Sequence, residues 1–168
     1  MGRSQTDEFE RFVAARWSAL NQLGSLLTGG DRQRAEDLVQ EALVKLWSAW
    51  SRVADEAPEA YARTVLVRLA ARSARRRWWG ERPSEQVPEV EAAGDLSASV
   101  AERTKLEAAL AQLPPRQRAA VVLRYYQDMS ESQVAEMLGA PIGTVRSHTR
   151  RGVERLRQIF ADVNETAG

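Results

Sequence analysis

The chain has 168 residues, of which 43% are hydrophobic and 28% charged, and its formal net charge is +1 at pH 7. This composition is typical of a soluble globular protein with one domain or two small ones. The absence of cysteine excludes a disulfide framework and thiolate metal sites, so we expect a cytoplasmic protein. No apolar run approaches the roughly 20 residues of a membrane span, and the N-terminus lacks a signal-peptide pattern.

The near-neutral total conceals a separation of charge along the chain. Residues 60–80 contain arginines and no carboxylate, residues 81–107 are mainly acidic, and residues 141–158 carry five arginines against Glu154. Two basic zones are therefore separated by an acidic one, a pattern that indicates an anionic partner more clearly than the total does.

Three helices are predicted in the first half. Apolar residues over 9–27 follow the 3.6-residue period of an amphipathic helix, which the sequence Thr-Gly-Gly at 28–30 should end. Asp31 is expected to cap a second helix, whose apolar stripe spans 35–50. Pro58 suits the first turn of a third helix, which continues into the arginines.

The second half is predicted to be a separate helical unit. Residues 81–99 are rich in proline, glycine, small polar residues and acids, and are interpreted as a flexible linker. Helical periodicity resumes at 100–113, and a further helix follows the proline pair at 114–115. We therefore predict an all-α fold with two small helical domains, 1–80 and 100–168, joined by the acidic linker 81–99.

A helix-turn-helix is predicted within the second domain. Ser130 followed three residues later by Gln133 forms a capping box that opens a short helix, and Gly139 is suited to ending it. A longer helix follows, and its expected buried face consists of Val145, Thr149, Gly152, Val153, Leu156 and Phe160.

The outer face of this longer helix carries the candidate DNA-reading residues. They are Thr144, Arg146, Ser147, His148, Arg150 and Arg151. Arginine, serine and threonine donate hydrogen bonds to phosphates and base edges, and the N-terminal half of such a helix enters the major groove. No second ligand lies near His148, so no metal site is predicted.

The third helix carries a second candidate nucleic-acid surface. Its basic and aromatic residues are Arg68, Arg72, Arg75, Arg76, Arg77, Trp78 and Trp79. Arginines at helical spacing suit a phosphate backbone, because each neutralised phosphate adds affinity by releasing counterions. The two tryptophans either stack on bases that have left the duplex or close the hydrophobic core.

The second helix carries a polar patch beside apolar residues. The patch lies next to the apolar residues Leu43, Val44 and Trp47, and it consists of Asp37, Gln40, Glu41 and Lys45. Such a patch is either an ordinary solvated face or, because apolar residues occupy more than one face, a contact with a partner protein.

These segments, in this order, resemble the sigma factors of bacterial RNA polymerase, specifically the small two-domain extracytoplasmic-function type and its sigma-E-like group in actinobacteria. Three stretches carry the resemblance from residue 9 to about 160: LLTGGDRQRAEDLVQEALVKLWSAW, PEAYARTVLVRLAARSARRRWW and LPPRQRAAVVLRYYQDMSESQVAEMLGAPIGTVRSHTRRGVERLR. They look like conserved region 2.2, regions 2.3 and 2.4, and region 4, respectively.

The resemblance implies a role for each surface. Asp37, Gln40 and Glu41 would dock on the β′ clamp helices of core RNA polymerase. The helix from Ala60 to Trp79 would bind the promoter −10 element and help capture a flipped base. Region 4 would read the −35 element in the major groove while its flank contacts the β flap.

The family also implies which partners to expect. Promoter DNA and core polymerase are expected partners, and an anti-sigma factor is a candidate one. We expect no enzymatic activity, cofactor, metal, membrane or small-molecule substrate.

Two positions depart from the family pattern. Arg68 stands where many members have asparagine, and Thr149 where many have leucine. We therefore expect the −10 readout to differ in detail and the recognition helix to seat less firmly.

Two other functions fit the residues. A free-standing helix-turn-helix regulator would use the N-terminal half for dimerisation or effector binding. A helical protein-interaction module would carry its basic faces without binding DNA.

Overall fold

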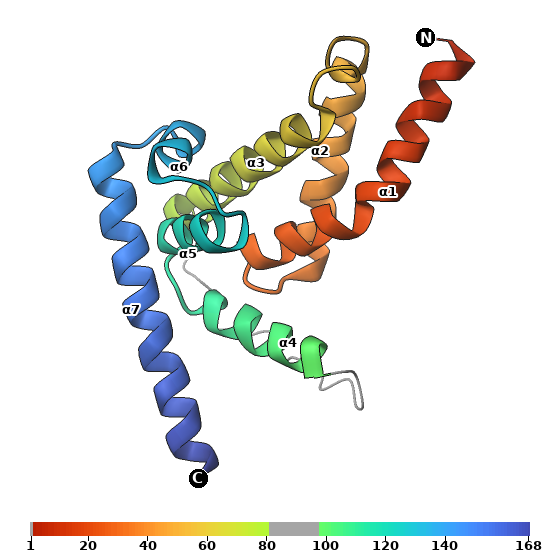
Figure 1. The fold of residues 1–168 in the computed structure, drawn as a ribbon. Coiled ribbons are helices and arrows are strands. Elements are labelled where there is room, and N and C mark those ends of the chain that lie inside the picture. The colour runs from red at the N-terminus through yellow and green to blue at the C-terminus, as the bar shows by residue number, and fades with distance from the viewer. Residues whose placement is uncertain (1, 81–97) are drawn as a thin grey trace.

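The computed structural model describes residues 2–80 and 98–168, and within these ranges every regular element is a helix (Figure 1). The elements are α1 Arg3–Leu27, α2 Arg32–Val53, α3 Pro58–Gly80, α4 Ala98–Ala111, α5 Pro115–Val121, the π-helical turn η1 Val122–Tyr126, α6 Glu131–Leu138 and α7 Ile142–Ala167. The predicted all-α class is confirmed.

Local signals set the ends of the first helices as predicted. α1 ends just before Gly29 and Gly30, whose φ angles of 67° and 85° are left-handed and suit residues without a side chain. The Asp31 side chain accepts a hydrogen bond from Arg34 N at 3.1 Å and caps α2. α3 begins at Pro58.

Aromatic side chains join α1 to α2. The ring of Phe9 lies 4.8 Å from that of Trp47 and 5.1 Å from that of Trp50, and Phe12 lies 5.5 Å from Trp50. Ring pairs at such distances add about 0.5–1.5 kcal/mol each beyond the burial of their area. The predicted stripe on α2 is buried: Ala35, Leu38, Val39, Ala42, Leu46 and Trp50.

The helix-turn-helix forms as predicted. Ser130 and Gln133 make the reciprocal capping box at α6, and Gly139 ends that helix with a φ of 62°. A Cβ on Gly152 would lie 2.6 Å from Val121 Cγ2, so α7 approaches α5 as closely as a glycine allows.

The inner face of α7 differs from the prediction at its far end. Val145, Thr149 and Gly152 are buried, whereas Val153 and Leu156 are half-buried and Phe160 is 36% exposed. Ile159 is buried instead. The prediction was wrong for Phe160 because the spacing from Leu156 allows either neighbour to turn inward, and packing selects Ile159.

The helix predicted after the proline pair is divided into two elements. α5 continues into η1, where Val122 and Leu123 are buried while Tyr126 is 44% exposed. α4 begins at Ala98, two residues before the predicted start. The rest of the predicted linker, 81–97, lies outside the described residues.

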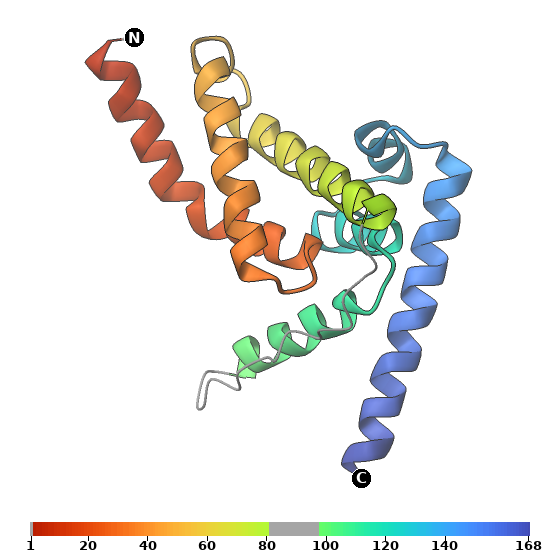
Figure 2. The same cartoon turned by 180° about the vertical axis from the view of Figure 1, so that it is seen from behind.

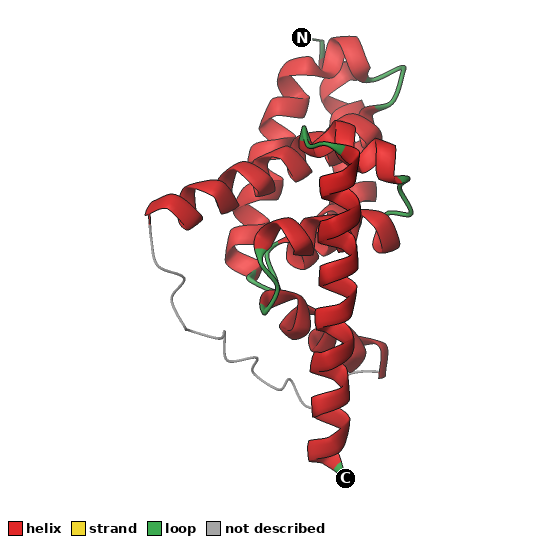
Figure 3. Cartoon of the chain, turned by 90° about the vertical axis from the view of Figure 1, so that its left-hand side faces the viewer, coloured by secondary structure: helices red, strands yellow, loops and turns green. Residues whose placement is uncertain are grey.

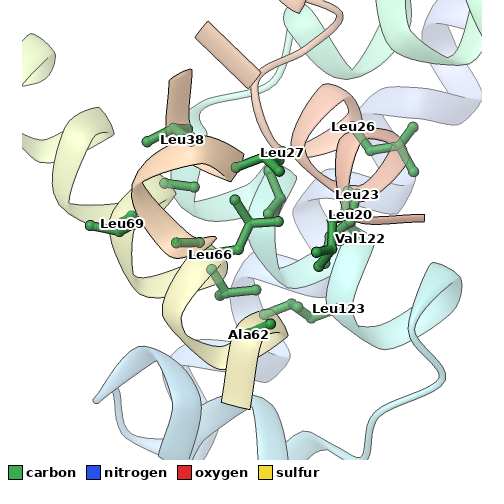
Figure 4. Close-up of a cluster of buried hydrophobic side chains, with 14 of the residues drawn as sticks. Leu20, Leu23, Leu26, Leu27, Leu38, Ala62, Leu66, Leu69, Val122 and Leu123 are labelled. Atoms are coloured by element: carbon green, nitrogen blue, oxygen red, sulfur yellow. The ribbon is translucent and has the colours of Figure 1, made fainter. Parts of the chain in front are cut away.

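The two helical units pack directly against each other. α3 lies beside α5, and α7 runs along the side opposite α1 (Figures 1 and 2). Leucines at the end of α1 share one buried cluster with Val122 and Leu123 of η1 and with Ala62 and Leu66 of α3 (Figure 4). Seen from the side, α7 runs along this body and only its C-terminal turns extend beyond the other helices (Figure 3). The sequence analysis did not predict this shared core.

Candidate nucleic-acid interface

The first turns of α7 present the predicted reading residues to different extents. Arg146, Arg150 and Arg151 are exposed, whereas Thr144, Ser147 and His148 are half-buried. The residues between them fix this orientation, because Val145 and Thr149 are buried against α5 and α6. One face of α7 is therefore packed against the protein, and its arginines lie on the exposed face.

Thr149 is accommodated without an unsatisfied hydroxyl. Its Oγ1 donates to the carbonyl oxygen of Val145 at 2.8 Å, one turn earlier in the same helix. A buried hydroxyl without a partner would be costly, so this bond is what permits threonine at a core position.

Arg146 is the one reading residue with an ion-pair partner in the described structure. Its Nε lies 2.5 Å from Glu131 Oε2, in the first turn of α6. The pair is exposed, so it holds the two helices of the motif in register at a small net energy. DNA phosphates would compete with Glu131 for this arginine.

His148 lies in a cationic environment. Partial burial, together with the positive charges of Arg116 and Arg151, lowers the pKa of His148 below its usual value. Its Nδ1 is buried and has no hydrogen-bond partner among the described residues. The imidazole is therefore neutral at pH 7, with one nitrogen available as an acceptor.

A cleft of about 680 Å³ separates α7 from α3. Thr144 and His148 line one wall, and Ala71 and Ala74 of α3 line part of the other. Two of the predicted reading residues thus face the helix that carries the second predicted DNA surface.

The basic row of α3 is only partly described. Arg68 and Arg72 are exposed, one turn apart, while Leu66 and Leu69 are buried as expected. Helical backbone continues to Gly80. The side chains of residues 75–80 lie outside the described part of the structure, including Arg75, Arg76, Arg77, Trp78 and Trp79, so the two interpretations of the tryptophans stand as predictions.

The polar patch of α2 is at the surface. Asp37, Gln40 and Glu41 are exposed, and Gln33 Nε2 donates to Asp37 Oδ1 at 3.3 Å. Val44, one of the apolar residues noted beside this patch in the sequence, is 66% exposed.

Three further arginines were not singled out from the sequence. Arg124 and Arg157 line a groove of about 500 Å³ together with Arg146 and Arg150. Arg118 of α5 is 9% exposed. Nothing in the local sequence distinguishes Arg118, because arginine normally lies at the surface.

Two structural findings concern other kinds of site. Within residues 2–80 and 98–168, no three histidine, aspartate or glutamate side chains gather as metal ligands. No helix in the same ranges is both long and apolar enough to cross a membrane.

Comparison with protein families gives two matches that together span most of the chain. The family model for sigma-70 region 2 matches residues 9–80, and that for sigma-70 region 4 matches residues 103–156. The region 2 match coincides with the first helical unit, and the region 4 match lies within the second.

Curated relatives align over nearly the full length. The RNA polymerase sigma-E factor of Streptomyces avermitilis is 35% identical, covering 94% of this chain and 88% of the relative. That of Streptomyces coelicolor is 36% identical, with coverages of 90% and 85%. The ECF RNA polymerase sigma factor SigL of Mycobacterium tuberculosis is 33% identical, with coverages of 82% and 80%.

Solved structures share the fold. CnrH in complex with the cytosolic domain of CnrY aligns with a TM-score of 0.58 at 22% identity, covering 92% of this chain and 88% of that one. The sigma factor RpoE from Bartonella quintana, in complex with the anti-sigma factor NepR, aligns with a TM-score of 0.59 at 24% identity, with coverages of 91% and 96%.

Proposed function

This chain belongs to the sigma-70 family of RNA polymerase sigma factors, in its extracytoplasmic-function group, and on that premise we propose that it binds core RNA polymerase in the cytoplasm and directs it to specific promoters. One observation carries the proposal: both family regions occur in the family order, and each contains a helix with exposed arginines. The chain supplies recognition and no catalytic step.

The −35 element is read by α7. Exposed Arg150 and Arg151 donate to guanine edges or phosphates, and Thr144, Arg146, Ser147 and His148 complete the surface that enters the major groove. The buried residues Val145 and Thr149 hold this surface at a fixed angle to α6.

The −10 element is bound by α3. Arg68 and Arg72 neutralise phosphates on one flank of the helix, and Arg75, Arg76 and Arg77 extend that row in the sequence. Trp78 or Trp79 stacks on a base outside the duplex. Stacking worth about 1–3 kcal/mol per base offsets an unstacking cost of a few kcal/mol, which favours melting.

Core polymerase is bound through α2. Asp37, Gln40 and Glu41 contact the β′ clamp helices, and exposed Val44 adds an apolar contact beside them. The flank of the second unit contacts the β flap. An anti-sigma factor is a further partner, because a protein with this fold, RpoE, was solved in complex with one.

Two domains that each bind DNA weakly are sufficient for promoter specificity when one chain joins them. Residues 1–80 and 100–168 act as separate DNA-binding domains, with 81–99 as their tether. Once one domain is bound, the tether raises the effective concentration of the other, so neither must bind tightly alone. The distance between promoter elements then becomes part of the recognition.

Run-off transcription with purified core polymerase tests the proposal. The chain should start transcripts from a subset of a promoter library, and core enzyme alone should not. Gel shifts with and without core polymerase separate the other functions. A free-standing regulator binds a palindrome without polymerase, and a protein-interaction module has no salt-dependent DNA affinity in any condition.

A further inference from the structure

The ion pair between the two helices of the helix-turn-helix leaves one end of an arginine free. Arg146 Nε donates to Glu131 Oε2 at 2.5 Å, and among the described residues neither Nη of Arg146 has a hydrogen-bond partner. A guanidinium can bind a pair of acceptors either through Nε and one Nη or through its two Nη. Because Glu131 occupies Nε, the two Nη are the pair that remains for DNA.

Both side chains of this ion pair start from firmly held backbone. Glu131 follows the capping residue Ser130 in the first turn of α6, and Val134, in the next turn, is fully buried. Arg146 follows Val145, which is 1% exposed on the packed face of α7. Because both backbones are fixed, the ion pair restricts the direction of the guanidinium even though the Arg146 side chain is 62% exposed.

Positive charge predominates around this ion pair. The groove of about 500 Å³ that contains it is lined by four arginines and two glutamates, which are Arg124, Arg146, Arg150, Arg157, Glu131 and Glu154. Arg150 lies one turn after Arg146, and like charges at this spacing on a helix repel each other. Glu131 is the carboxylate that pairs with Arg146 in this groove, so it sets the direction that the Arg146 side chain takes.

A carboxylate beside Arg146 affects the two kinds of DNA acceptor differently. A phosphate is an anion and is repelled by Glu131, whereas a guanine edge presents the neutral acceptors O6 and N7. Two N–H groups of an arginine match these two acceptors, which is the commonest base-specific contact in the major groove. Among the described residues, Arg150 and Arg151 have no ion-pair partner, so they suit phosphates better than Arg146 does.

We propose that Glu131 is a positioning residue that commits Arg146 to reading a guanine of the −35 element instead of binding a phosphate. The inference rests on the proposed function, because it specifies how the −35-binding surface distinguishes one base pair. Glu131 acts through Arg146 and does not itself contact the base. Arg150 and Arg151 then supply affinity for the phosphates.

Promoter discrimination by the assembled holoenzyme tests the proposal. Run-off transcription is measured on a promoter that the parent chain uses and on variants in which each base pair of the −35 element is replaced in turn. Arg146→Gln identifies the base pair that Arg146 reads, because discrimination of about tenfold or more should be lost at that pair alone. Glu131→Gln should lower discrimination at the same pair by about fivefold or more and leave the other pairs unchanged.

Binding of the holoenzyme to non-specific duplex DNA should change in the opposite direction. Without the carboxylate, Arg146 can neutralise one more phosphate. Glu131→Gln should therefore raise the non-specific affinity and steepen the slope of log K against log salt by about 0.9. If Glu131 only stabilised α6, its loss would lower affinity for every sequence alike, so the opposite changes distinguish positioning from folding.

Glu154→Gln is the matched control. It removes the same charge from the same groove, and Glu154 has no ion-pair partner within the described residues. Its discrimination at the −35 element should stay at the parental level. Glu131→Asp keeps the charge in the first turn of α6 but shortens the side chain, so it should lower discrimination in part. It replaces Glu131→Gln if circular dichroism shows that variant to be unfolded.

The outcomes separate this inference from the proposed function. Parental discrimination in the Glu131 variants, or a loss that is equal on every promoter, overturns the positioning role. An Arg146→Gln variant that discriminates like the parent at every pair also overturns it, because Arg146 then reads no base. A parent chain that starts no transcripts with core polymerase overturns the proposed function itself.

Discussion

The two proposed DNA-reading surfaces differ in how far the fold covers them. On α3, Arg68 and Arg72 are exposed, and the covered flank of that helix carries the small residues Ala71 and Ala74. On α7, three of the six reading residues are half-buried, and two of these line the cleft with α3. Arg68 and Arg72 of α3 are therefore fully at the surface, whereas part of the proposed reading face of α7 is covered.

The largest expected effect comes from reversing the charge of arginines on α3. Arg72→Glu combined with Arg76→Glu replaces attraction to phosphates with repulsion and should lower run-off transcription by about 100-fold, or about 2.7 kcal/mol. Reversing Arg3 and Arg11, exposed on α1, serves as the control and should have little effect. Transcription at the parental rate in the first variant would show that α3 is not the −10 reader.

The next largest effect is expected where α7, the proposed −35-binding helix, packs on α5. Gly152→Ala places a Cβ 2.6 Å from Val121 Cγ2 and should destabilise the helix-turn-helix by roughly 1–3 kcal/mol. Gly143→Ala lies on the same helix with nothing within 4 Å of the new Cβ, so it should be neutral or slightly stabilising. Thermal unfolding measures both. Equal melting temperatures for the two variants would contradict the close packing of α7 on α5.

A smaller effect is expected where the end of α1 meets α4. Gly29→Ala forces a Cβ to 2.6 Å from Ala111 Cα and should lower the melting temperature by more than a control with the same backbone strain. Gly139→Ala is the matched control, because its φ of 62° is close to the 67° of Gly29 and its new Cβ meets nothing within 4 Å. Both changes carry a left-handed strain of about 1 kcal/mol or more, so only the difference reports the close approach of Gly29 to Ala111. If Gly29→Ala melts no earlier than Gly139→Ala, that close approach is contradicted.

The smallest effect is a pH dependence of stability at His148. Its pKa is lowered in the folded chain by partial burial and by Arg116 and Arg151, so the unfolded chain binds the proton more readily. The contribution of His148 to the free energy of unfolding is fully present above the unfolded-state pKa. It is lost as the pH falls through the lower pKa of the folded chain. His148→Gln should therefore flatten the pH dependence of the melting temperature below the usual histidine pKa of about 6.5. An unchanged profile would mean that His148 is not held neutral by its surroundings.

Short-range signals predicted the parts of the fold that short-range forces decide. Asp31, the Ser130 and Gln133 capping box, and Gly139 each satisfy the ends of their own helices within four residues, so the sequence pattern is sufficient to find them. The outward arginines of α7 followed from its 3.6-residue period for the same reason.

The hydrogen bonds between the two helical units were not predictable in this way. Arg118 Nη1 donates to Leu27 O, 91 residues away, and the side chains of Tyr126 and Gln22 pair across 104 residues, with no periodicity that links either pair. A buried arginine has the same sequence signature as a surface one. Ile159 and Phe160 illustrate the limit within one helix, because adjacent apolar residues compete for one inward position and only tertiary packing decides between them.

A footprint of the assembled complex tests the account most directly. The chain bound to core polymerase should protect two separate patches of one promoter, near −10 and near −35. The Arg72 and Arg76 reversals should weaken the first patch, and reversal of Arg150 and Arg151 the second. A single palindromic patch protected by the chain alone, or a chain that never joins core polymerase even at low ionic strength, would contradict it.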